Sequence, residues 1–478
     1  MTPEEFRVAG YRLIDWITDY RNSIESRPVR AQVAPGDIRS RFPETPPDSP
    51  ADFDSLLQSM TEDILPGITQ VQHPMHFGWF PSNASLESVL GDMASSGLGT
   101  LGISWESCPA LTEVEEVMCD WMRQLAGLSR QWEGTIHDTA STACLTALLL
   151  ARERSTDHCQ TRDGLQGHEK PLTVYLTGES HSSIRKSALL AGFGARNIRT
   201  VPVDPVTRAM IPEALSDQVR DDRSRGCQPC VIVATVGTTG VTAIDPVDSI
   251  AGIAKENGMW VHLDAALAGT AMLLPECRYL WSGVEGTDSL SWNVHKWMGT
   301  VLDCSLFYVR NPEHLIRVMS TNPSYLRSAV DGAATQYRDW GIPLGRRFRA
   351  LKLLFQLRLE GIESIRARLR RDIANAKWLG EQVEKEKHWK VLAPYVLQTV
   401  CIRHEPPGLA GEALDAHTLS WAAAINHSGR AFLSPAKMEG RWFVRVSIGV
   451  QSTTRAHVEQ LWHLMQETAK ERGPSPSG

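Results

Sequence analysis

The sequence predicts an α/β fold built around a mainly parallel β-sheet. Across residues 86–310, strand patterns alternate with helical patterns, which is the order that produces right-handed strand–helix–strand units. Residues 231–236 form a continuous run rich in β-branched residues, as expected for a strand buried on both faces. Beyond Arg346, a long helical pattern followed by a strand pattern at 442–448 predicts a smaller α+β domain.

Breaks in composition divide the chain into three predicted parts. An amphipathic helical pattern precedes a proline-rich stretch at 43–50, so residues 1–85 are expected to form a separate N-terminal helical segment. Residues 86–345 are expected to form the large α/β domain, and residues 346–478 the small C-terminal α+β domain. Within the large domain, residues 319–340 include small and polar stretches typical of a mobile catalytic loop.

Composition and charge narrow the class of protein. The chain has 478 residues, 42% hydrophobic and 22% charged, which is ordinary for a globular protein of two or three domains. Its formal charge of -6 argues against a nucleic-acid partner, which would need a concentrated basic surface. The start lacks a hydrophobic signal core and no apolar stretch is long enough to span a membrane, so a cytoplasmic protein without a membrane partner is expected.

The cysteines predict neither a disulfide framework nor a metal site. There are 9 of them at irregular spacing in a long chain. Cys227 and Cys230 form the one close pair, and no second pair completes a zinc site.

A lysine among bulky, poorly solvated neighbours is the first candidate catalytic residue. Lys296 lies in the run SWNVHKW at 291–297, where apolar surroundings favour the neutral amine that an imine-forming lysine requires. Asp264 ends a strand-like run, and the carboxyl ends of parallel strands are where open α/β sheets bind ligands. A carboxylate there keeps the ring nitrogen of pyridoxal phosphate (PLP) protonated, so the pair predicts a PLP site. Alone, each residue also fits an ordinary role, a surface lysine or a turn-forming aspartate.

Three further segments strengthen this prediction by their order along the chain. Small hydroxyl residues at 138–143 open a helix whose first N–H groups could hold a phosphate, although a plain helix cap looks the same. His181 follows a strand-like run and could lie against a flat ring, although an isolated histidine is more often structural. The run 231–236 ends in GTTG at 237–240, which an ordinary buried strand and turn would also explain.

Together these stretches resemble the PLP-dependent group II amino acid decarboxylases, and within them the aromatic L-amino acid (DOPA, tryptophan and tyrosine) decarboxylases. The resemblance covers about residues 3–465 and rests on FGWFPS at 77–82, SW at 104–105, PA at 109–110, AS at 140–141, HSS at 181–183, GTT at 237–239, DAA at 264–266, NVHKW at 293–297 and PLGRRF at 343–348. It implies a fold-type I homodimer with a seven-stranded sheet and active sites at the dimer interface, in which the N-terminal helical segment, residues 1–85, packs on the partner subunit and so serves dimerisation. It also implies conversion of an aromatic L-amino acid to its amine and carbon dioxide.

The resemblance also implies a role for individual residues. Lys296 would carry PLP as an internal aldimine, Asp264 would face the pyridine nitrogen, and His181 would stack on the ring. The other cofactor contacts would come from Ala140, Ser141, Thr239, Ala266, Asn293 and His295. The substrate pocket would comprise Trp79, Phe80, Ser82, Leu101, Ile103, His181 and Gly345, with Leu101 and Ile103 reaching across the dimer.

The catalytic loop would decide which product forms. The resemblance implies that Tyr325 protonates the quinonoid at the alpha carbon of the substrate. Relatives with phenylalanine at this position, or asparagine at the position of His181, tend to be aldehyde synthases. Because this chain has Tyr325 and His181, simple decarboxylation is favoured. The loop sequence at 322–326 looks like that of bacterial members.

Three positions depart from the family pattern. Leu267 stands where many relatives have tyrosine, and Asp138 and Thr142 replace a common glycine and glutamate near the phosphate-binding turn. A carboxylate beside a phosphate is unfavourable, so Asp138 is expected to point away or to pair with a cation. These departures bear on cofactor affinity rather than on the type of reaction.

Other functions remain open at this point. The chain could be a PLP-dependent aldehyde synthase, a decarboxylase of a non-aromatic amino acid or, with less support, an aminotransferase. It could also be a catalytically silent PLP-binding partner protein. The preferred aromatic substrate is open too, since Gly345 leaves room for an indole but DOPA decarboxylases share this glycine.

Overall fold

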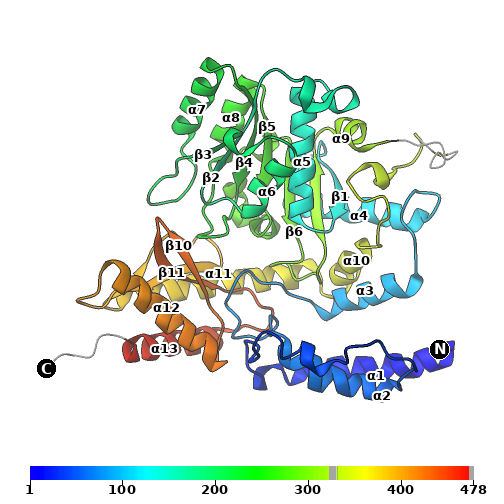
Figure 1. The fold of residues 1–478 in the computed structure, drawn as a ribbon, viewed down its shortest axis with the longest axis vertical. Helices are drawn as coiled ribbons and strands as arrows, with labels where there is room; N and C mark the ends of the chain where they lie inside the picture. The colour runs from blue at the N-terminus through cyan, green and yellow to red at the C-terminus, as the bar shows by residue number, and fades with distance from the viewer. Residues whose placement is uncertain (322–329, 331, 473–478) are drawn as a thin grey trace. The chain divides into compact units, whose positions relative to one another are not determined.

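The computed structural model describes residues 1–321, 330 and 332–472, which divide into two compact units (Figure 1). Unit 2 holds most of the chain and contains Ser82–Ala374 and Ala393–Val400. Unit 1 combines three separate stretches, Met1–Pro81, Asn375–Leu392 and Cys401–Gly478.

Unit 2 is built on a seven-stranded sheet in the order β1-β7-β6-β5-β4-β2-β3. The strands are β1 (Glu133–His137), β2 (Leu172–Thr177), β3 (Ile198–Val201), β4 (Gln228–Thr235), β5 (Trp260–Asp264), β6 (Ser289–Asn293) and β7 (Ser305–Val309). The neighbouring strands β3, β2, β4, β5 and β6 run parallel to one another, whereas β7 is antiparallel to both β6 and β1. The predicted mainly parallel, seven-stranded sheet is therefore confirmed.

Helices surround the strands of this sheet in the sequence. The helices of unit 2 are α3 (Leu86–Leu98), α4 (Pro109–Ala126), α5 (Ala140–Ser155), α6 (Ser182–Leu190), α7 (Pro212–Ser224), α8 (Val247–Asn257), α9 (Pro312–Met319), α10 (Ala350–Leu359) and the part of α11 (Ile362–Lys385) up to Ala374. Of these, α4, α5, α7 and α8 pack directly against the strands. Local sequence explains several helix ends: α4, α7 and α9 begin with proline, and α3, α4 and α8 end at a left-handed glycine. Short 3₁₀ turns join many of these elements.

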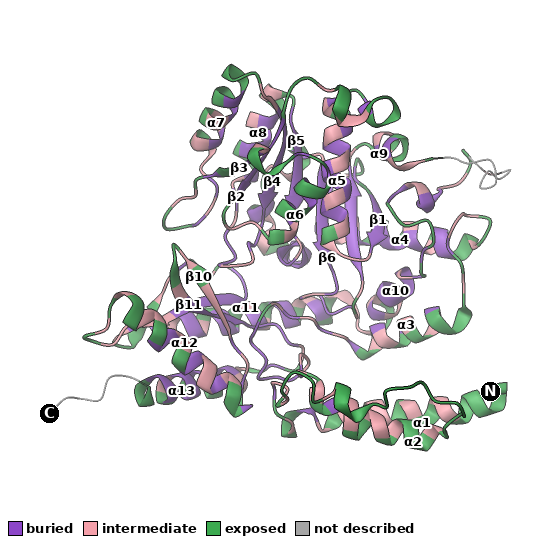
Figure 2. Cartoon of the chain, in the orientation of Figure 1, coloured by how far each residue is buried: buried purple, intermediate pink, exposed green. Residues whose placement is uncertain are grey.

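The sheet forms the core of unit 2. Figure 2 shows its strands as almost entirely buried, while its outer helices alternate buried and exposed faces. Every residue of β5 is buried, and in β4 only the first residue is partly exposed, as the β-branched run predicted. A cluster of apolar residues from α5, α6 and the strands, including Leu148, Val174 and Phe307, packs at its centre.

Strand direction determines where a ligand site can form. Because β1 and β6 are both antiparallel to β7, β1 runs in the same direction as the parallel strands. The carboxyl ends of β1 to β6 therefore meet at one edge of the sheet, and the loops that follow them lie side by side.

Unit 1 contains a four-stranded sheet in the order β10-β11-β9-β8 and several helices. Its elements are α1 (Pro3–Asn22), α2 (Phe53–Ser59), β8 (Trp389–Val391), α12 (Gly411–Ser428), β10 (Ser434–Met438), β11 (Arg441–Ser447), α13 (Arg455–Glu471) and β9 (Thr399–His404) from Cys401 onward. The predicted N-terminal helix is present as α1, which starts with a Thr2/Glu5 capping box and buries no residue. The predicted helical segment and smaller α+β part are thus confirmed as part of the fold.

One close contact in the core gives a test of the packing. Gly269 follows β5, and a Cβ atom at this position would lie 2.5 Å from Cγ of the fully buried Trp292. We expect Gly269→Ala to lower the free energy of unfolding by about 1–3 kcal/mol, because the indole cannot move aside without strain. Urea unfolding measures this change.

A matched control lies in α8. Gly252 has open space around its Cβ position, so Gly252→Ala should leave stability unchanged or raise it by about 1 kcal/mol. Equal unfolding midpoints for the two variants would contradict the packing argument.

Candidate active site

The candidate catalytic residues of unit 2 lie at the carboxyl edge of its sheet. Asp264 is the last residue of β5, and Asn293 is the last residue of β6, with Lys296 in the turn that follows. His181 lies in the loop after β2, and Thr239 lies in the loop after β4. Since these strands are parallel, residues that are distant in sequence meet at the same edge.

Asn293 joins three of these segments by hydrogen bonds. Its backbone N–H donates to the carbonyl oxygen of Ala266 at 3.0 Å, and its carbonyl accepts from the Lys296 N–H at 3.2 Å. Its side-chain Oδ1 accepts from the backbone N–H of Ala140 at 3.0 Å. Asn293 is buried, so the start of α5, the turn after β5 and the Lys296 segment are tied together inside the protein.

Lys296 is partly exposed among fully buried neighbours. Trp292, Val294 and Trp297 have no exposed surface, and His295 is buried. Burial lowers the pKa of His295 to about 4, and the positive charge of Lys296 acts in the same direction. The Nδ1 atom of His295 lies 2.9 Å from the backbone nitrogen of Cys304, which donates to it. The amine thus has the poorly solvated setting that the sequence predicted, while its side chain keeps contact with solvent.

Asp264 presents a buried carboxylate at the end of β5. Its Oδ1 accepts a hydrogen bond from the backbone N–H of Ala266 at 3.0 Å. Burial raises the pKa of the Cys144 thiol in α5, and the negative charge of Asp264 raises it further. The carboxylate therefore acts electrostatically on α5, the helix whose start was predicted to hold a phosphate.

His262 was assigned no role by the sequence analysis. Its Nδ1 lies 2.9 Å from Oγ of Ser289, and its Nε2 lies 3.4 Å from Oγ of Ser291. Burial lowers the pKa of His262 to about 4, and the charge of Asp264 opposes that shift. Side chains two positions apart in a strand share a face, so the spacing of His262 and Asp264 could have revealed this neighbour.

His181 forms the N-cap of α6 and is electrostatically coupled to both charged residues. Its Nδ1 contacts Oγ of Ser183 at 2.7 Å and accepts from the Ser183 N–H at 3.2 Å. Desolvation lowers the pKa of His181, Lys296 acts in the same direction, and Asp264 acts in the opposite one. The imidazole is exposed, so a bound molecule could reach its ring.

The start of α5 has the features of an anion site. The N-cap residue, Thr139, makes no side-chain hydrogen bond to the first turn, and Ser141 in that turn is exposed. The first N–H groups of a helix have no partner within it, and the helix dipole favours negative charge there. Asp138 is one of the residues that depart from the family pattern. Its carboxylate accepts a hydrogen bond from the neighbouring Thr139 N–H at 2.7 Å.

The residues at this edge fit PLP. An amine that can bond to an aldehyde, a buried carboxylate that can pair with a ring nitrogen, and a helix start that can receive a phosphate lie together in unit 2. Thr239 and Ala266, which are both partly exposed, lie in the loops between them.

Two of the predicted substrate residues, Trp79 and Phe80, lie in unit 1. The Trp79 ring lies 4.9 Å from that of Phe432, and its backbone N–H donates to Oγ of Ser434 at 2.6 Å. Trp79 is 52% exposed and has a left-handed φ of +48°, a strained conformation for a bulky residue that is typical of functional sites. The Arg445 guanidinium lies over the Phe80 ring at 4.7 Å.

The other predicted substrate residues lie in loops of unit 2. Ser82 precedes α3, and Leu101 and Ile103 follow it. Leu101 is 56% exposed, and a Cβ at the exposed Gly345 would meet open space. Tyr325, the predicted proton donor, lies outside the described residues. The substrate roles of these residues stay predictions.

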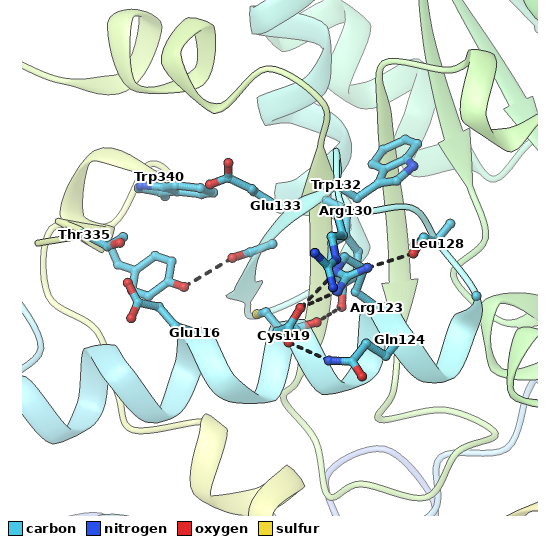
Figure 3. Close-up of a pocket in the computed structure, with 15 residues that line it drawn as sticks. Glu116, Cys119, Arg123, Gln124, Leu128, Arg130, Trp132, Glu133, Thr335 and Trp340 are labelled. Atoms are coloured by element: carbon cyan, nitrogen blue, oxygen red, sulfur yellow. Dashed lines mark hydrogen bonds and ion pairs between the residues drawn. The ribbon is translucent and has the colours of Figure 1, made fainter.

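A separate cleft of about 790 Å³ lies along α4 and β1 (Figure 3). Beside it, the Tyr337 hydroxyl donates to the Gly134 carbonyl at 3.3 Å, and Arg123 donates to the Asp120 carboxylate. Figure 3 shows the hydrogen bond from Arg123 to the Leu128 carbonyl. None of the described candidate residues lines this cleft. The candidate site is therefore assigned from the chemistry at the sheet edge and not from cavity size.

Comparisons with known proteins place the chain in a family. Residues 35–405 match the pyridoxal-dependent decarboxylase conserved domain. The chain belongs to the pyridoxal-dependent decarboxylase family. It is 37% identical to tryptophan decarboxylase 2 of Oryza sativa over 98% of this chain and 95% of that protein. It is also 37% identical to phenylacetaldehyde synthase of Arabidopsis thaliana, over 98% and 96% of the two chains.

A solved structure agrees with this assignment. The crystal structure of Oryza sativa TDC with PLP and tryptamine matches with a TM-score of 0.95 and 32% identity, covering 98% of this chain and 99% of the other. The predicted cofactor and enzyme class, PLP and a carboxy-lyase, are confirmed. The relatives named here are plant proteins, so the expected bacterial type gains no support. Within the described residues, no helix is both long and apolar enough to cross a membrane.

The buried His262 makes stability depend on pH. Its folded pKa of about 4 lies below the ordinary value of 6.5, so between these values the unfolded chain binds a proton that the folded protein does not. Stability is therefore lost as the pH falls through this window. We expect this residue to account for about 2 kcal/mol of the stability lost between about pH 7 and pH 5.

His262→Asn removes the titrating group, so the variant should lose less stability than the wild type over the same pH range. Urea unfolding of both proteins at the two pH values measures the difference. Asp245 and Asp372, whose pKa values burial raises to about 6, titrate in both proteins and cancel in the comparison. Parallel losses in the two proteins would show that His262 is not the cause.

Proposed function

We propose that the protein decarboxylates an aromatic L-amino acid to the corresponding amine and carbon dioxide. The observation that carries this proposal is the joining of the Lys296 segment, the turn after Asp264 and the start of α5 through Asn293 at one sheet edge. Support for an aromatic substrate comes from relatives at 36–37% identity named tryptophan decarboxylase 2 and tyrosine decarboxylase 2.

We propose a role for each candidate residue at the sheet edge. Lys296 supplies the amine that holds the PLP aldehyde, Asp264 keeps a proton on the ring nitrogen, and His181 lies against the ring. Ala140 and Ser141 at the start of α5 receive the phosphate, and the remaining contacts come from Thr239, Ala266, Asn293 and His295. When bound, PLP accepts the electron pair that the departing carboxylate leaves on the alpha carbon of the substrate.

The proposed substrate pocket is apolar and aromatic. Trp79 and Phe80 offer rings against which an aromatic side chain packs well, and Gly345 leaves open space. Leu101 and Ile103 contribute apolar surface, and Ser82 lies near the substrate carboxylate. A site that gives this carboxylate little charge stabilisation favours its departure as neutral carbon dioxide.

We further propose that the protein is a homodimer with its active sites at the interface. Support comes from exposed apolar side chains on two helices. Phe6 and Tyr11 on α1 are 65% and 64% exposed, and Leu90 and Leu98 on α3 are 46% and 63% exposed. Apolar surface of this kind marks an interaction site, and a second copy of the chain would cover it.

A second candidate function is aldehyde synthesis. It is favoured by the 37% identity to phenylacetaldehyde synthase, which equals the identity to tryptophan decarboxylase 2. Tyr325 and His181 favour the amine product over the aldehyde, because an aldehyde-forming relative is expected to lack one of them.

Product analysis tests the proposal. The holoenzyme is incubated separately with L-DOPA, L-tyrosine, L-tryptophan, L-phenylalanine and L-glutamate, and carbon dioxide, amine, aldehyde and peroxide are measured. We expect amine and carbon dioxide in equal amounts from at least one aromatic acid and no turnover of glutamate, whose charged side chain would lose its hydration in an apolar pocket. Glutamate turnover at similar efficiency would overturn the aromatic assignment.

Tyr325→Phe tests the proposed proton donor. A phenol with an ordinary pKa of about 10 is protonated at neutral pH and can give a proton to the alpha carbon, whereas a phenyl ring cannot. We expect the variant to form less amine and more aldehyde, with consumption of oxygen. Tyr308→Phe is the control for loss of a tyrosine hydroxyl. The Tyr308 hydroxyl is buried and donates to the Cys119 carbonyl, so this variant should still form the amine. Unchanged amine output from Tyr325→Phe would remove this tyrosine from the mechanism.

A further inference from the structure

The residues that follow Lys296 are held by polar side chains from α10 and α11. Trp297 and Met298 come directly after the lysine and have no exposed surface. Three side chains of unit 2 bond to them: Gln356 from α10, and Arg368 and Asp372 from α11. These helices lie far along the chain from Lys296, so the contacts belong to the tertiary structure.

Asp372 accepts a hydrogen bond from the side chain next to the lysine. The Nε1–H group of Trp297 donates to Oδ2 of Asp372 at 3.0 Å, and both residues are fully buried. Arg371 donates to the other carboxylate oxygen at 3.0 Å. Burial raises the pKa of Asp372 to about 6, with the Arg371 charge opposing the shift. A buried carboxylate is costly, so its place beside the indole calls for a role that an apolar residue could not fill.

Arg368 fixes the backbone of the same segment. Its Nη1 donates to the Trp297 carbonyl at 3.0 Å, and its Nη2 donates to the Met298 carbonyl at 2.6 Å. The rigid guanidinium fork thus holds two successive carbonyls in one orientation. Gln356 donates to the same Met298 carbonyl at 3.1 Å and accepts from Oγ1 of Thr300 at 2.7 Å.

We propose that Arg368 and Asp372 are positioning residues that set the place and orientation of Lys296 through Trp297 and Met298. Arg368 acts on the backbone and Asp372 acts on the indole, so together they restrict both translation and rotation of the segment. The inference rests on the proposed role of Lys296 as the PLP-bearing residue. A displacement of about 1 Å in a reacting group can cost on the order of a hundredfold in rate, so such restraint bears directly on catalysis.

The test uses holoenzymes with Asp372→Leu and Arg368→Met, which remove the polar contacts while keeping similar volume. The readouts are kcat and a pH titration of the visible absorption of bound PLP, which reports the surroundings of the lysine and not the stability of the fold. We expect kcat to fall about tenfold or more, and the titration midpoint to shift by about half a unit or more. Asp372→Asn and Arg368→Lys, which keep an acceptor or a donor, should recover most of both properties.

A second variant tests the contact itself. Trp297→Phe removes the indole donor and should shift the titration in the same direction as Asp372→Leu. The double variant, Trp297→Phe with Asp372→Leu, should change kcat and the titration midpoint no more than the single variant with the larger effect, because both substitutions break the same hydrogen bond. Additive effects would show that Asp372 does not act through Trp297 and would overturn its assignment.

Arg370→Gln is the matched control on α11, since Arg370 is half exposed and pairs with Glu276 at 2.6 Å. It should leave kcat and the titration unchanged. Variants of Asp372 and Arg368 that melt earlier but keep the wild-type titration would reduce these residues to structural support, and so would an equal shift in Arg370→Gln. Borohydride trapping with peptide mapping of the wild type separates the two proposals: label elsewhere than Lys296 means that the proposed function has failed.

Discussion

The candidate site depends on the hydrogen bonds that Asn293 makes at the end of β6. A buried amide is tolerated only when its polar atoms are paired, and here three of them bind three different segments. The parallel sheet brings these segments to one edge, but strand direction alone does not set the spacing between a helix start and a lysine. The Asn293 side chain does, because its Oδ1 atom connects α5 to the strand that leads into Lys296.

Much of this site could be predicted from sequence, because its parts depend on local patterns. Lys296 stands out by its bulky neighbours, and Asp264 by its place at the end of an apolar strand. The partners of Trp297 gave no such signal, since Asp372 lies 75 positions away and contacts between distant helices leave no periodic trace. Nor could the left-handed backbone of Trp79 be predicted, because a bulky aromatic residue favours extended conformations.

The same means of fixing irregular segments recurs elsewhere in unit 2. Glu115 of α4 accepts hydrogen bonds from the Ile136 N–H and the Thr135 hydroxyl of β1, and from the Arg346 guanidinium. The side chains of Glu115, Thr135 and Arg346 are all buried. The charged pair of Glu115 and Arg346 therefore joins a helix, a strand and a loop that no regular hydrogen-bond ladder connects. Such pairs add little to stability, but they specify one arrangement because a displaced partner would leave a buried charge unpaired.

Lys296 is held in this way from both sides. Asn293 fixes the backbone before it, and Arg368 with Asp372 holds the residues after it. The backbone therefore has little freedom, whereas the side chain is partly exposed at the sheet edge. This division suits the role proposed for Lys296, an amine that bonds to a cofactor and later releases it to a substrate. The nitrogen can move over the length of its own side chain, while the backbone position that carries the side chain stays in place. A lysine on an unrestrained loop would have to recover that position by chance in every turnover, at a cost in conformational entropy that the fixed backbone avoids.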